Sequence, residues 1–278
     1  DILAWLRGGE PERVPWNIHH ALLRQGALER EMRNLGLGVV EKGVRPYQAI
    51  APHVSVEERH AWEKGNRARY ITHHTSLGDL HSKKVIGPDG STWTDEYPVK
   101  GVDDLAVLEF ITEDTVYYPN YDAVLDRQNT LGEDGIVVCR MMRSPLQCLF
   151  VDWMGTEGVV FGLADYREAM EHLLQCMATA DEAALQIAVQ SPAELVWSSE
   201  NITALITNPR LFTRYCTPYY NHFASVLHSQ GKLYGLHMDG QLAALKEAIA
   251  NIHVDFIEGF TPPPMGDLEL AEAKSAWL

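Results

Sequence analysis

The sequence predicts an α/β protein of the (β/α)8 barrel class. Short apolar runs alternate with stretches of helical spacing, an order that is typical of a parallel sheet covered by helices. A length of 278 residues suits one domain of barrel size. A doubly wound sheet would want a glycine-rich phosphate loop after an early strand, and GLGVVEKG at residues 36–43 does not match that loop. We therefore expect residues 1–278 to form a single domain.

Six strand-then-helix units can be placed along the chain. We expect strands near residues 14, 39, 137, 195, 234 and 255, each followed by a helix. The helical stretches before the fourth strand are at residues 21–38, 102–126 and 165–189, and the second opens on acidic residues, as a helix start favours. A barrel needs eight units. The last units are therefore expected to lie beyond Leu278, where the pattern is still helical.

Residues 70–99 interrupt this order with short β-like pieces. They read YITHHTSLG, KKVIG and STWTDEYPV, and the turn Gly87-Pro88-Asp89-Gly90 joins the second to the third. We expect an inserted β-hairpin here and not a barrel strand.

Composition excludes several classes of partner. The formal net charge of -15 argues against nucleic acid and against an anionic membrane surface. The four cysteines show no CxxC spacing and lie in apolar neighbourhoods, so core packing is expected for each. We find no apolar run that could span a bilayer and no signal-like start, so a cytoplasmic protein is expected.

Residues 231–267 place polar side chains at two successive strand ends. KLYGLHMD stops at His237 and Asp239, and the following strand closes on Glu258 before a proline-rich loop leads to Asp267, which we expect to cap the last helix. In a parallel barrel the loops after the strands converge on the catalytic face. This end of the sheet is therefore where the sequence predicts the active site.

The stretches SSENIT, NPRLFTRYCTPYY, GKLYGLHMDG and IEGFTPPPMGDLELAEAKSAW resemble the uroporphyrinogen decarboxylase superfamily. With the PERVPW start and the hairpin, they cover most of the chain in the expected order. The resemblance implies a TIM barrel and one of two chemistries, decarboxylation of uroporphyrinogen or methyl transfer to or from corrinoid (cobalamin) proteins. The choice between them has to be made at individual positions.

Two departures favour methyl transfer from an ether. The decarboxylases carry an arginine-rich signature after the first strand, of which Arg24-Gln25-Gly26 keeps only a fragment, and no basic cluster is found for a substrate with many carboxylates. The coenzyme M methyltransferases hold zinc on a His-x-Cys pair, and here the matching place reads His237-Met238-Asp239. A carboxylate in place of a thiolate suits an oxygen-bearing substrate. The resemblance is thus closest to the methyltransferase component of corrinoid-dependent O-demethylases.

This resemblance assigns candidate roles. His237, Asp239 and Glu200 either hold zinc or form an acid and hydrogen-bond group against the ether oxygen. The residues expected to line the substrate pocket are Asn17, His19, His20, Met141, Asn201 and Glu258. Bland alternatives remain open, since His237 could satisfy a buried backbone group and Glu258 could be a solvated loop carboxylate. Because adjacent residues of an extended segment alternate faces, at most one of His19 and His20 is expected to face the pocket.

Three functions therefore stay in competition. The first is a methyltransferase that moves the methyl group of a methyl ether, preferably an aryl ether, to the Co(I) corrinoid of a partner protein. Its partners would be a corrinoid protein and a small-molecule methyl donor, and a homodimer is compatible with it. The second is uroporphyrinogen decarboxylase, which needs no cofactor. The third is a non-catalytic barrel that binds a corrinoid protein.

Overall fold

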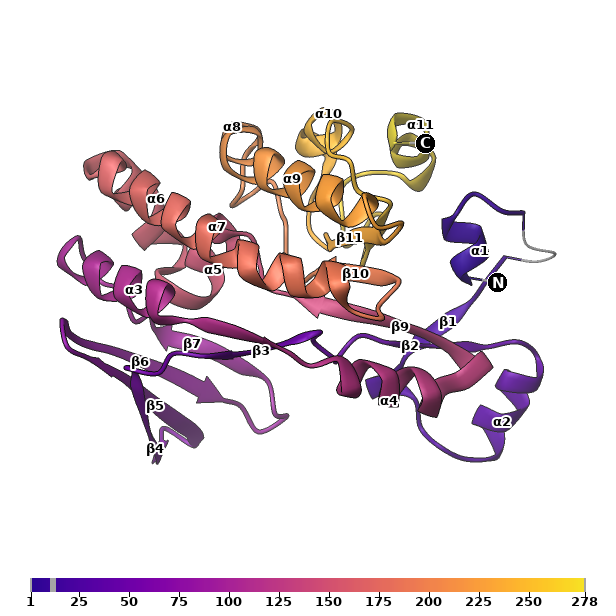
Figure 1. Ribbon diagram of the computed structural model, residues 1–278, viewed down its shortest axis with the longest axis horizontal. Coiled ribbons are helices and arrows are strands. Elements are labelled where there is room, and N and C mark those ends of the chain that lie inside the picture. The colour runs from indigo at the N-terminus through magenta and orange to yellow at the C-terminus, as the bar shows by residue number, and fades with distance from the viewer. Residues whose placement is uncertain (1, 11–13, 278) are drawn as a thin grey trace. The chain divides into compact units, whose positions relative to one another are not determined.

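The computed structural model describes residues 2–10 and 14–277 (Figure 1). Asp1, Leu278 and residues 11–13, which belong to the PERVPW segment, lie outside this range. The strands are β1 (Asn17–His19), β2 (Gly38–Glu41), β3 (Tyr47–Ile50), β4 (Ser55–Glu63), β5 (Asn66–Thr75), β6 (Gly78–Ile86), β7 (Thr92–Glu96), β8 (Val116–Pro119), β9 (Gly135–Met141), β10 (Leu195–Ser198), β11 (Leu233–His237) and β12 (Phe256–Glu258).

The helices lie before, between and after these strands along the chain. They are α1 (Ile2–Leu6), α2 (Ala27–Asn34), α3 (Asp103–Asp114), α4 (Tyr121–Leu131), α5 (Pro145–Cys148), α6 (Gly155–Asp165), α7 (Arg167–Gln190), α8 (Pro209–Leu211), α9 (Thr217–His228), α10 (Lys246–Ile249) and α11 (Leu270–Trp277). Short 3-10 or π segments are η1 (His20–Leu22), η2 (Gly132–Asp134), η3 (Leu149–Trp153), η4 (Phe212–Cys216) and η5 (Ala243–Leu245). Among the described residues, no helix combines the length and the apolar character that crossing a membrane requires.

The six predicted strands form one parallel sheet in chain order. Its order is β1-β2-β9-β10-β11-β12, and every neighbouring pair is parallel. Strands that pair in chain order, each reached through a crossover, are the pattern of a (β/α) barrel. The alternation of apolar runs and helical stretches was therefore sufficient to predict the sheet, apart from the first strand. That strand begins at Asn17 because Pro15 has no N–H to donate to a neighbour.

The sheet is curled. Lys42 follows β2 and Glu258 ends β12, and β9, β10 and β11 lie between these two strands in the sheet. In a flat sheet the two positions would be about 19 Å apart, at roughly 4.8 Å per strand step. Yet the Lys42 ammonium forms an ion pair with the Glu258 carboxylate. The α/β architecture is consistent with part of a (β/α) barrel.

The concave side of the sheet is filled by side chains. Val138, Leu195 and Trp197 form a buried cluster on β9 and β10, and partly buried apolar residues pack around it. These residues are Leu3, Leu6, Val40, Ile136, Leu233 and Phe256. Two of them come from α1, so the amino-terminal helix packs against the cluster. Apolar side chains from β2, β9, β10, β11 and β12 thus meet in one core.

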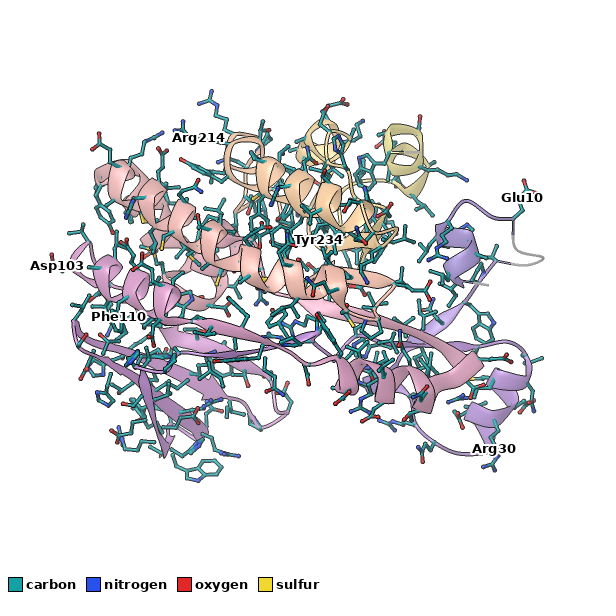
Figure 2. The ribbon with its side chains drawn as sticks, in the orientation of Figure 1. Glu10, Arg30, Asp103, Phe110, Arg214 and Tyr234 are labelled. Carbon is teal, nitrogen blue, oxygen red and sulfur yellow. The ribbon has the colours of Figure 1, made fainter. Side chains whose placement is uncertain are left out.

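Helices cover the other side of the sheet. α4 packs against β9 and α9 against β11. Tyr234 of β11, labelled in Figure 2, is fully buried, and its ring lies 6.1 Å from the ring of Phe223 on α9. Its hydroxyl shares a 2.9 Å hydrogen bond with Ser198 of β10. The polar atom of a buried tyrosine is therefore satisfied inside the layer.

The excursion after the second strand is an antiparallel sheet of four strands in the order β4-β5-β6-β7. β6 and β7 are joined at the predicted turn, where the Gly90 N–H donates to the Gly87 carbonyl at 3.0 Å. The excursion begins earlier than the predicted residue 70, since β4 starts at Ser55. β4 is mostly exposed and charged, so it has no apolar alternation by which the sequence would reveal it.

The predicted helix over residues 102–126 is wrong as one element. The structure has two helices, α3 and α4, separated by β8, which pairs with β3. β8 reads VYYP, and its β-branched and aromatic residues favour a strand over a helix. Tertiary pairing with β3 therefore overrides the helical spacing on either side.

The described chain divides into two compact units. One consists of residues 1–48, 118–142 and 184–278 and contains the parallel sheet, and the other consists of residues 49–117 and 143–183 and contains the antiparallel sheet. The division falls within β3, β8 and α7. A single domain over residues 1–278 stays a prediction.

The helix predicted over residues 21–38 is shorter, and its end is well defined. His20–Leu22 forms a 3-10 turn, and α2 begins after Gly26. At its end Gly36 adopts φ +94°, the Gly36 N–H donates to Arg33 and the Leu37 N–H donates to Met32. This is a Schellman motif, and it sets the direction in which the chain enters β2.

Candidate active site

Two predicted residues meet at the carboxyl ends of β11 and β12. His237 is the last residue of β11 and Glu258 the last of β12, and the two are paired in register. The Nδ1 atom of His237 lies 2.5 Å from a Glu258 carboxylate oxygen, and its Nε2 atom lies 3.4 Å from the Asp239 carboxylate. The imidazole is therefore held between two acidic groups, with only one of its nitrogens in a close hydrogen bond.

Lys42 completes this group. Its ammonium pairs with the Glu258 oxygen that His237 does not use, and it lies 5.1 Å from the centre of the Trp197 ring. Trp197 also meets the His237 ring edge-on, with 5.8 Å between centroids. Four side chains thus contact one another in sequence beside the Trp197 ring. We call them the charged chain; they are Lys42, Glu258, His237 and Asp239.

The charged chain alters the proton affinity of its members. The hydrogen bond to Glu258 raises the pKa of His237, and the nearby Asp239 charge adds to this effect. Burial raises the pKa of Glu258, but hydrogen bonds from His237 and Lys42 outweigh burial and lower that pKa to about 2. His237 therefore keeps its proton to a higher pH than an ordinary histidine, opposite a permanent carboxylate.

Trp197 presents an unsatisfied donor beside this group. The residue is 7% exposed, and its indole Nε1 has no hydrogen-bond partner among the described residues. A buried donor without an acceptor costs about 1–3 kcal/mol. An ordered water inside the core that accepts from this N–H would remove that cost.

The His237 ring packs closely against the loop after β12. Gly259 has φ +83°, and a Cβ atom at this position would lie 2.7 Å from Cε1 of His237. The next turn is tied to the neighbouring loop, because the Thr261 hydroxyl donates to the Asp239 carbonyl at 2.8 Å. The glycine is needed both for its backbone conformation and for the space that it leaves to the imidazole.

His19 and His20 do not point to opposite faces as predicted. Their rings stack, with centroids 4.6 Å apart, because His20 begins a 3-10 turn in place of an extended segment. His19 Nδ1 accepts from the Ala21 N–H at 3.0 Å. Burial lowers the pKa of His19, and the charge of Lys42 lowers it further, so His19 loses its proton more readily than an ordinary histidine.

Four other predicted residues do not join the charged chain, because two are fully buried and two are exposed elsewhere. Glu200 is fully buried and accepts from the Tyr220 hydroxyl at 2.9 Å. Met141, at the end of β9, is also fully buried. Asn17 is exposed at the first residue of β1, which is not the strand's carboxyl end. Asn201 is exposed and adopts φ +58°, a conformation that asparagine tolerates.

The predicted zinc ligands do not form a ligand set in the part of the chain that the structure describes. His237, Asp239 and Glu200 do not bring three ligand atoms within 4.8 Å of one another. His237 Nδ1 is already taken by Glu258, and Glu200 is held by Tyr220. The residues present fit a hydrogen-bonded acid better than a metal centre.

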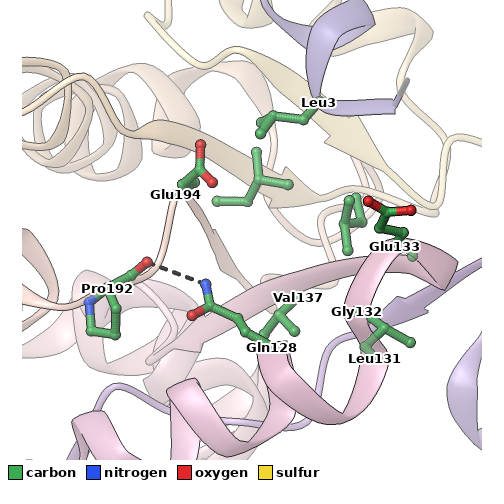
Figure 3. A pocket seen from close by; sticks show the side chains of 11 residues that line it. Leu3, Gln128, Leu131, Gly132, Glu133, Val137, Pro192 and Glu194 are labelled. Atoms are coloured by element: carbon green, nitrogen blue, oxygen red, sulfur yellow. Dashed lines mark hydrogen bonds between the residues drawn. The ribbon is translucent and has the colours of Figure 1, made fainter.

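A cavity of about 790 Å³ lies at the opposite end of the sheet. It is lined where β9 and β10 begin, by residues such as Gly135 and Leu195, and Figure 3 shows the Gln128 amide donating to the Pro192 carbonyl at its edge. In barrels that end contributes to stability, whereas catalytic groups lie at the carboxyl ends of the strands. This cavity is therefore not the candidate site.

Sequence reasoning missed Lys42 and Trp197. Glu41-Lys42-Gly43 follows β2 directly, so Lys42 carries the same signal as His237, a polar residue at a strand end. Trp197 is inside β10 and looks like any core aromatic in the sequence. Its role depends on which side chains the curled sheet places beside it.

Similarity to known proteins is found among solved structures. No family model matches the sequence, and no curated protein is similar to it. Among solved structures, the fold is similar to that of a methyltransferase from Methanosarcina mazei, with 12% sequence identity and a TM-score of 0.42. The match covers 60% of this chain and 49% of that protein, so the chain corresponds to about half the length of the structure it matches. A similarity this distant does not define an activity.

Proposed function

We propose that this chain is the methyltransferase component of a corrinoid-dependent O-demethylase. It would move the methyl group of a methyl ether, preferably an aryl ether, to the Co(I) corrinoid of a partner protein. One observation carries the proposal, namely the charged chain that holds His237 at the carboxyl end of the sheet with a raised pKa. The resemblance to the uroporphyrinogen decarboxylase superfamily supplies the reaction class, and the site supplies the residue that the reaction needs.

Ether cleavage needs an acid because its leaving group is a poor one. The phenol released from an aryl ether has a pKa of about 10, like tyrosine, so expulsion of the phenoxide is slow without a proton. In the proposed step the corrinoid, as methyl acceptor, supplies the electron pair that forms the new bond to carbon. The C–O bond breaks with its electron pair on oxygen, and that oxygen takes the proton from His237 Nε2.

The neighbours of His237 have distinct tasks in this proposal. Glu258 orients the imidazole through Nδ1 and keeps it protonated, and Lys42 holds Glu258 in place. Asp239 lies beside Nε2 at 3.4 Å, where it can hold the ring while a substrate oxygen takes the proton. His19 would line the pocket.

The proposal routes no step through zinc, because the predicted ligands do not come together. It also places the reaction in the cytoplasm, in a full (β/α)8 barrel whose open end meets the corrinoid protein. Arg24, the remnant of the decarboxylase signature, is exposed in the loop before α2. Of the charged chain only Lys42 is a permanent cation, and one cation suits a small ether better than a substrate with many carboxylates.

The test is to incubate the protein with a Co(I) corrinoid protein and a guaiacol-type ether. We expect methyl-cobalt absorbance and the free phenol to appear together in equal amounts. Neither product would appear if the proposal were wrong. Formation of coproporphyrinogen from uroporphyrinogen would establish the decarboxylase instead, and binding of the corrinoid protein without turnover, unchanged in His237→Ala, would establish the non-catalytic barrel.

A further inference from the structure

A second group of metal-ligating side chains lies in the unit that contains the antiparallel sheet. α3 carries Glu109 and Glu113, and α7 carries His172 and Cys176. Each pair is spaced i, i+4, so both of its members lie on one face of their helix. In Figure 2, the label Phe110 marks the position on α3 that follows Glu109.

The two faces meet. His172 Nε2 lies 2.7 Å from a Glu109 carboxylate oxygen, and Cys176 Sγ lies 3.9 Å from a Glu113 oxygen. One oxygen of Glu109, one of Glu113 and the Cys176 sulfur all lie within 4.8 Å of one another, so small side-chain movements would bring them around one cation. His172 adjoins this group through its contact with Glu109. Two ligands on each of two helices, one helical turn apart, is a geometry that a tetrahedral ion can use.

The charges of this group are unbalanced without a cation. Glu109 and Glu113 are like charges at i, i+4, a spacing that destabilises a helix. Among the described residues, the basic side chain that pairs with this group is His172, which contacts Glu109. Its side chain is 68% exposed and carries a charge only when protonated. A divalent ion would offset both carboxylates and join α3 to α7.

We propose that Glu109, Glu113 and Cys176 bind one zinc ion, which links α3 to α7, and that His172 turns from Glu109 to supply the fourth ligand. Sulfur, imidazole nitrogen and carboxylate oxygen are the ligand types of zinc, and four of them complete its usual coordination in structural sites. Calcium and magnesium, which prefer oxygen ligands only, fit this group poorly. The sequence had suggested core packing for Cys176, but its side chain is only partly buried and faces acidic groups.

The site is tested on the whole protein by titration with Zn²⁺ in the presence of a competing zinc-chelating dye, and with Co²⁺ as a spectroscopic probe. We expect one Zn²⁺ per chain at this site and a thiolate-to-cobalt charge-transfer absorption in the near ultraviolet. Cys176→Ser should abolish that absorption, and His172→Ala should weaken Zn²⁺ binding at least about tenfold. The control Glu168→Gln, an exposed residue of the same helix, should bind as the unchanged protein does.

A further variant distinguishes zinc binding at this group from zinc binding at the candidate active site. His237→Ala should leave Zn²⁺ binding and the cobalt absorption unchanged, because His237 belongs to the other unit. A measurement on the unchanged protein does not depend on how the variants fold. Bound Zn²⁺ should slow alkylation of Cys176 by iodoacetamide, measured by peptide mass spectrometry, relative to Cys148. The proposal is overturned if Zn²⁺ does not bind, if binding survives Cys176→Ser and His172→Ala, or if only His237→Ala removes it.

Discussion

At the scale of single residues, the chemistry of the candidate site rests on the pairing of His237 with Glu258. A histidine at a strand end is common. Here the Nδ1 atom of His237 meets the Glu258 carboxylate, and Lys42 fixes that carboxylate in place. The imidazole is therefore oriented and favoured in its protonated form, as a general acid requires. Glu258 has a pKa of about 2, so at pH values well above 2 its negative charge stabilises the imidazolium.

Glu258→Gln should lower the pKa of His237. The amide can still accept a hydrogen bond, but it carries no charge, and the hydrogen bond to Glu258 is the largest cause of the raised pKa. NMR titration of the imidazole measures the change, and the alkaline limb of the activity profile should move to lower pH with it. Asp239→Asn is the matched control, with a smaller shift. Equal shifts in the two variants would contradict the assignment.

Gly259→Ala should disturb His237 as well as the backbone. At φ +83° an alanine costs about 1–2 kcal/mol of stability, and its Cβ atom would also lie 2.7 Å from the imidazole. Gly231→Ala is the matched control, because Gly231 has φ +67° but nothing within 4 Å of an added Cβ. Both variants should lose stability in urea unfolding, and only Gly259→Ala should change the His237 titration. An unchanged titration in Gly259→Ala would show that the imidazole has room to move.

At the scale of elements, capping groups come from unexpected places. Asp267 was predicted to cap the helix that follows it, but its carboxylate accepts from the N–H groups of Leu242 and Ala243 at 2.7 and 2.9 Å. It therefore caps the helical segment after β11, which comes earlier in the chain. The sequence shows the capping residue type but not which helix start lies within its reach.

Asp267→Ala should destabilise the protein by about 1 kcal/mol, as the loss of a capping side chain does. The loss is expected because two backbone donors would lose their acceptor while Leu242, beside them, remains buried. Urea unfolding monitored by circular dichroism measures it. Asp267→Asn keeps the accepting oxygen and should lose less. Equal losses in the two variants would indicate that charge, and not the hydrogen bonds, is what Asp267 contributes.

The elements that the sequence predicts well are those with strong periodicity. The central strands β9, β10 and β11 are largely apolar and buried, and the stripe on α7 is buried at Met170, Leu173, Leu185 and Ala188. β4 and β8 could not be predicted in this way, because one is an exposed edge strand and the other is defined by its pairing with β3. Local pattern identifies an element only where burial imposes that pattern.

At the scale of the whole molecule, the curl of the sheet creates the candidate site. His237, Asp239 and Glu258 could be proposed from strand ends alone, but Lys42 joins them only because β2 comes round to β12. Glu200 shows the converse, since it is at a strand end and yet turns into the core toward Tyr220. The curl of the sheet decides which strand-end residues meet. The local pattern of a single sequence does not contain that information.

The stability of the protein should depend on pH through the same pair. Glu258 has a pKa of about 2 when folded against an ordinary value of 4.5, so its stabilising contribution is complete above about pH 4.5 and is lost as pH falls toward 2. His237 has a raised pKa, so its contribution is complete below about pH 6.5 and is lost as pH rises through the folded value. The joint contribution is therefore greatest between about pH 4.5 and 6.5.

This dependence is measured as the free energy of unfolding in urea across pH. The difference between the unchanged protein and Glu258→Gln should be largest inside that window and should shrink on both sides of it. A difference that stays constant from acid to alkaline pH would show that the pair is not linked to folding.

The central claim is that His237 delivers a proton to the leaving oxygen, and the most direct measurement varies that oxygen. Single-turnover methyl transfer would be compared for the unchanged protein and His237→Asn on two aryl methyl ethers, one releasing an ordinary phenol with a pKa of about 10 and one releasing a much more acidic nitrophenol. We predict a loss of about 10²–10⁴-fold in His237→Asn for the first ether and a much smaller loss for the second, because an acidic phenol leaves without help. The same loss for both ethers would contradict the account, since His237 would then not act as the acid.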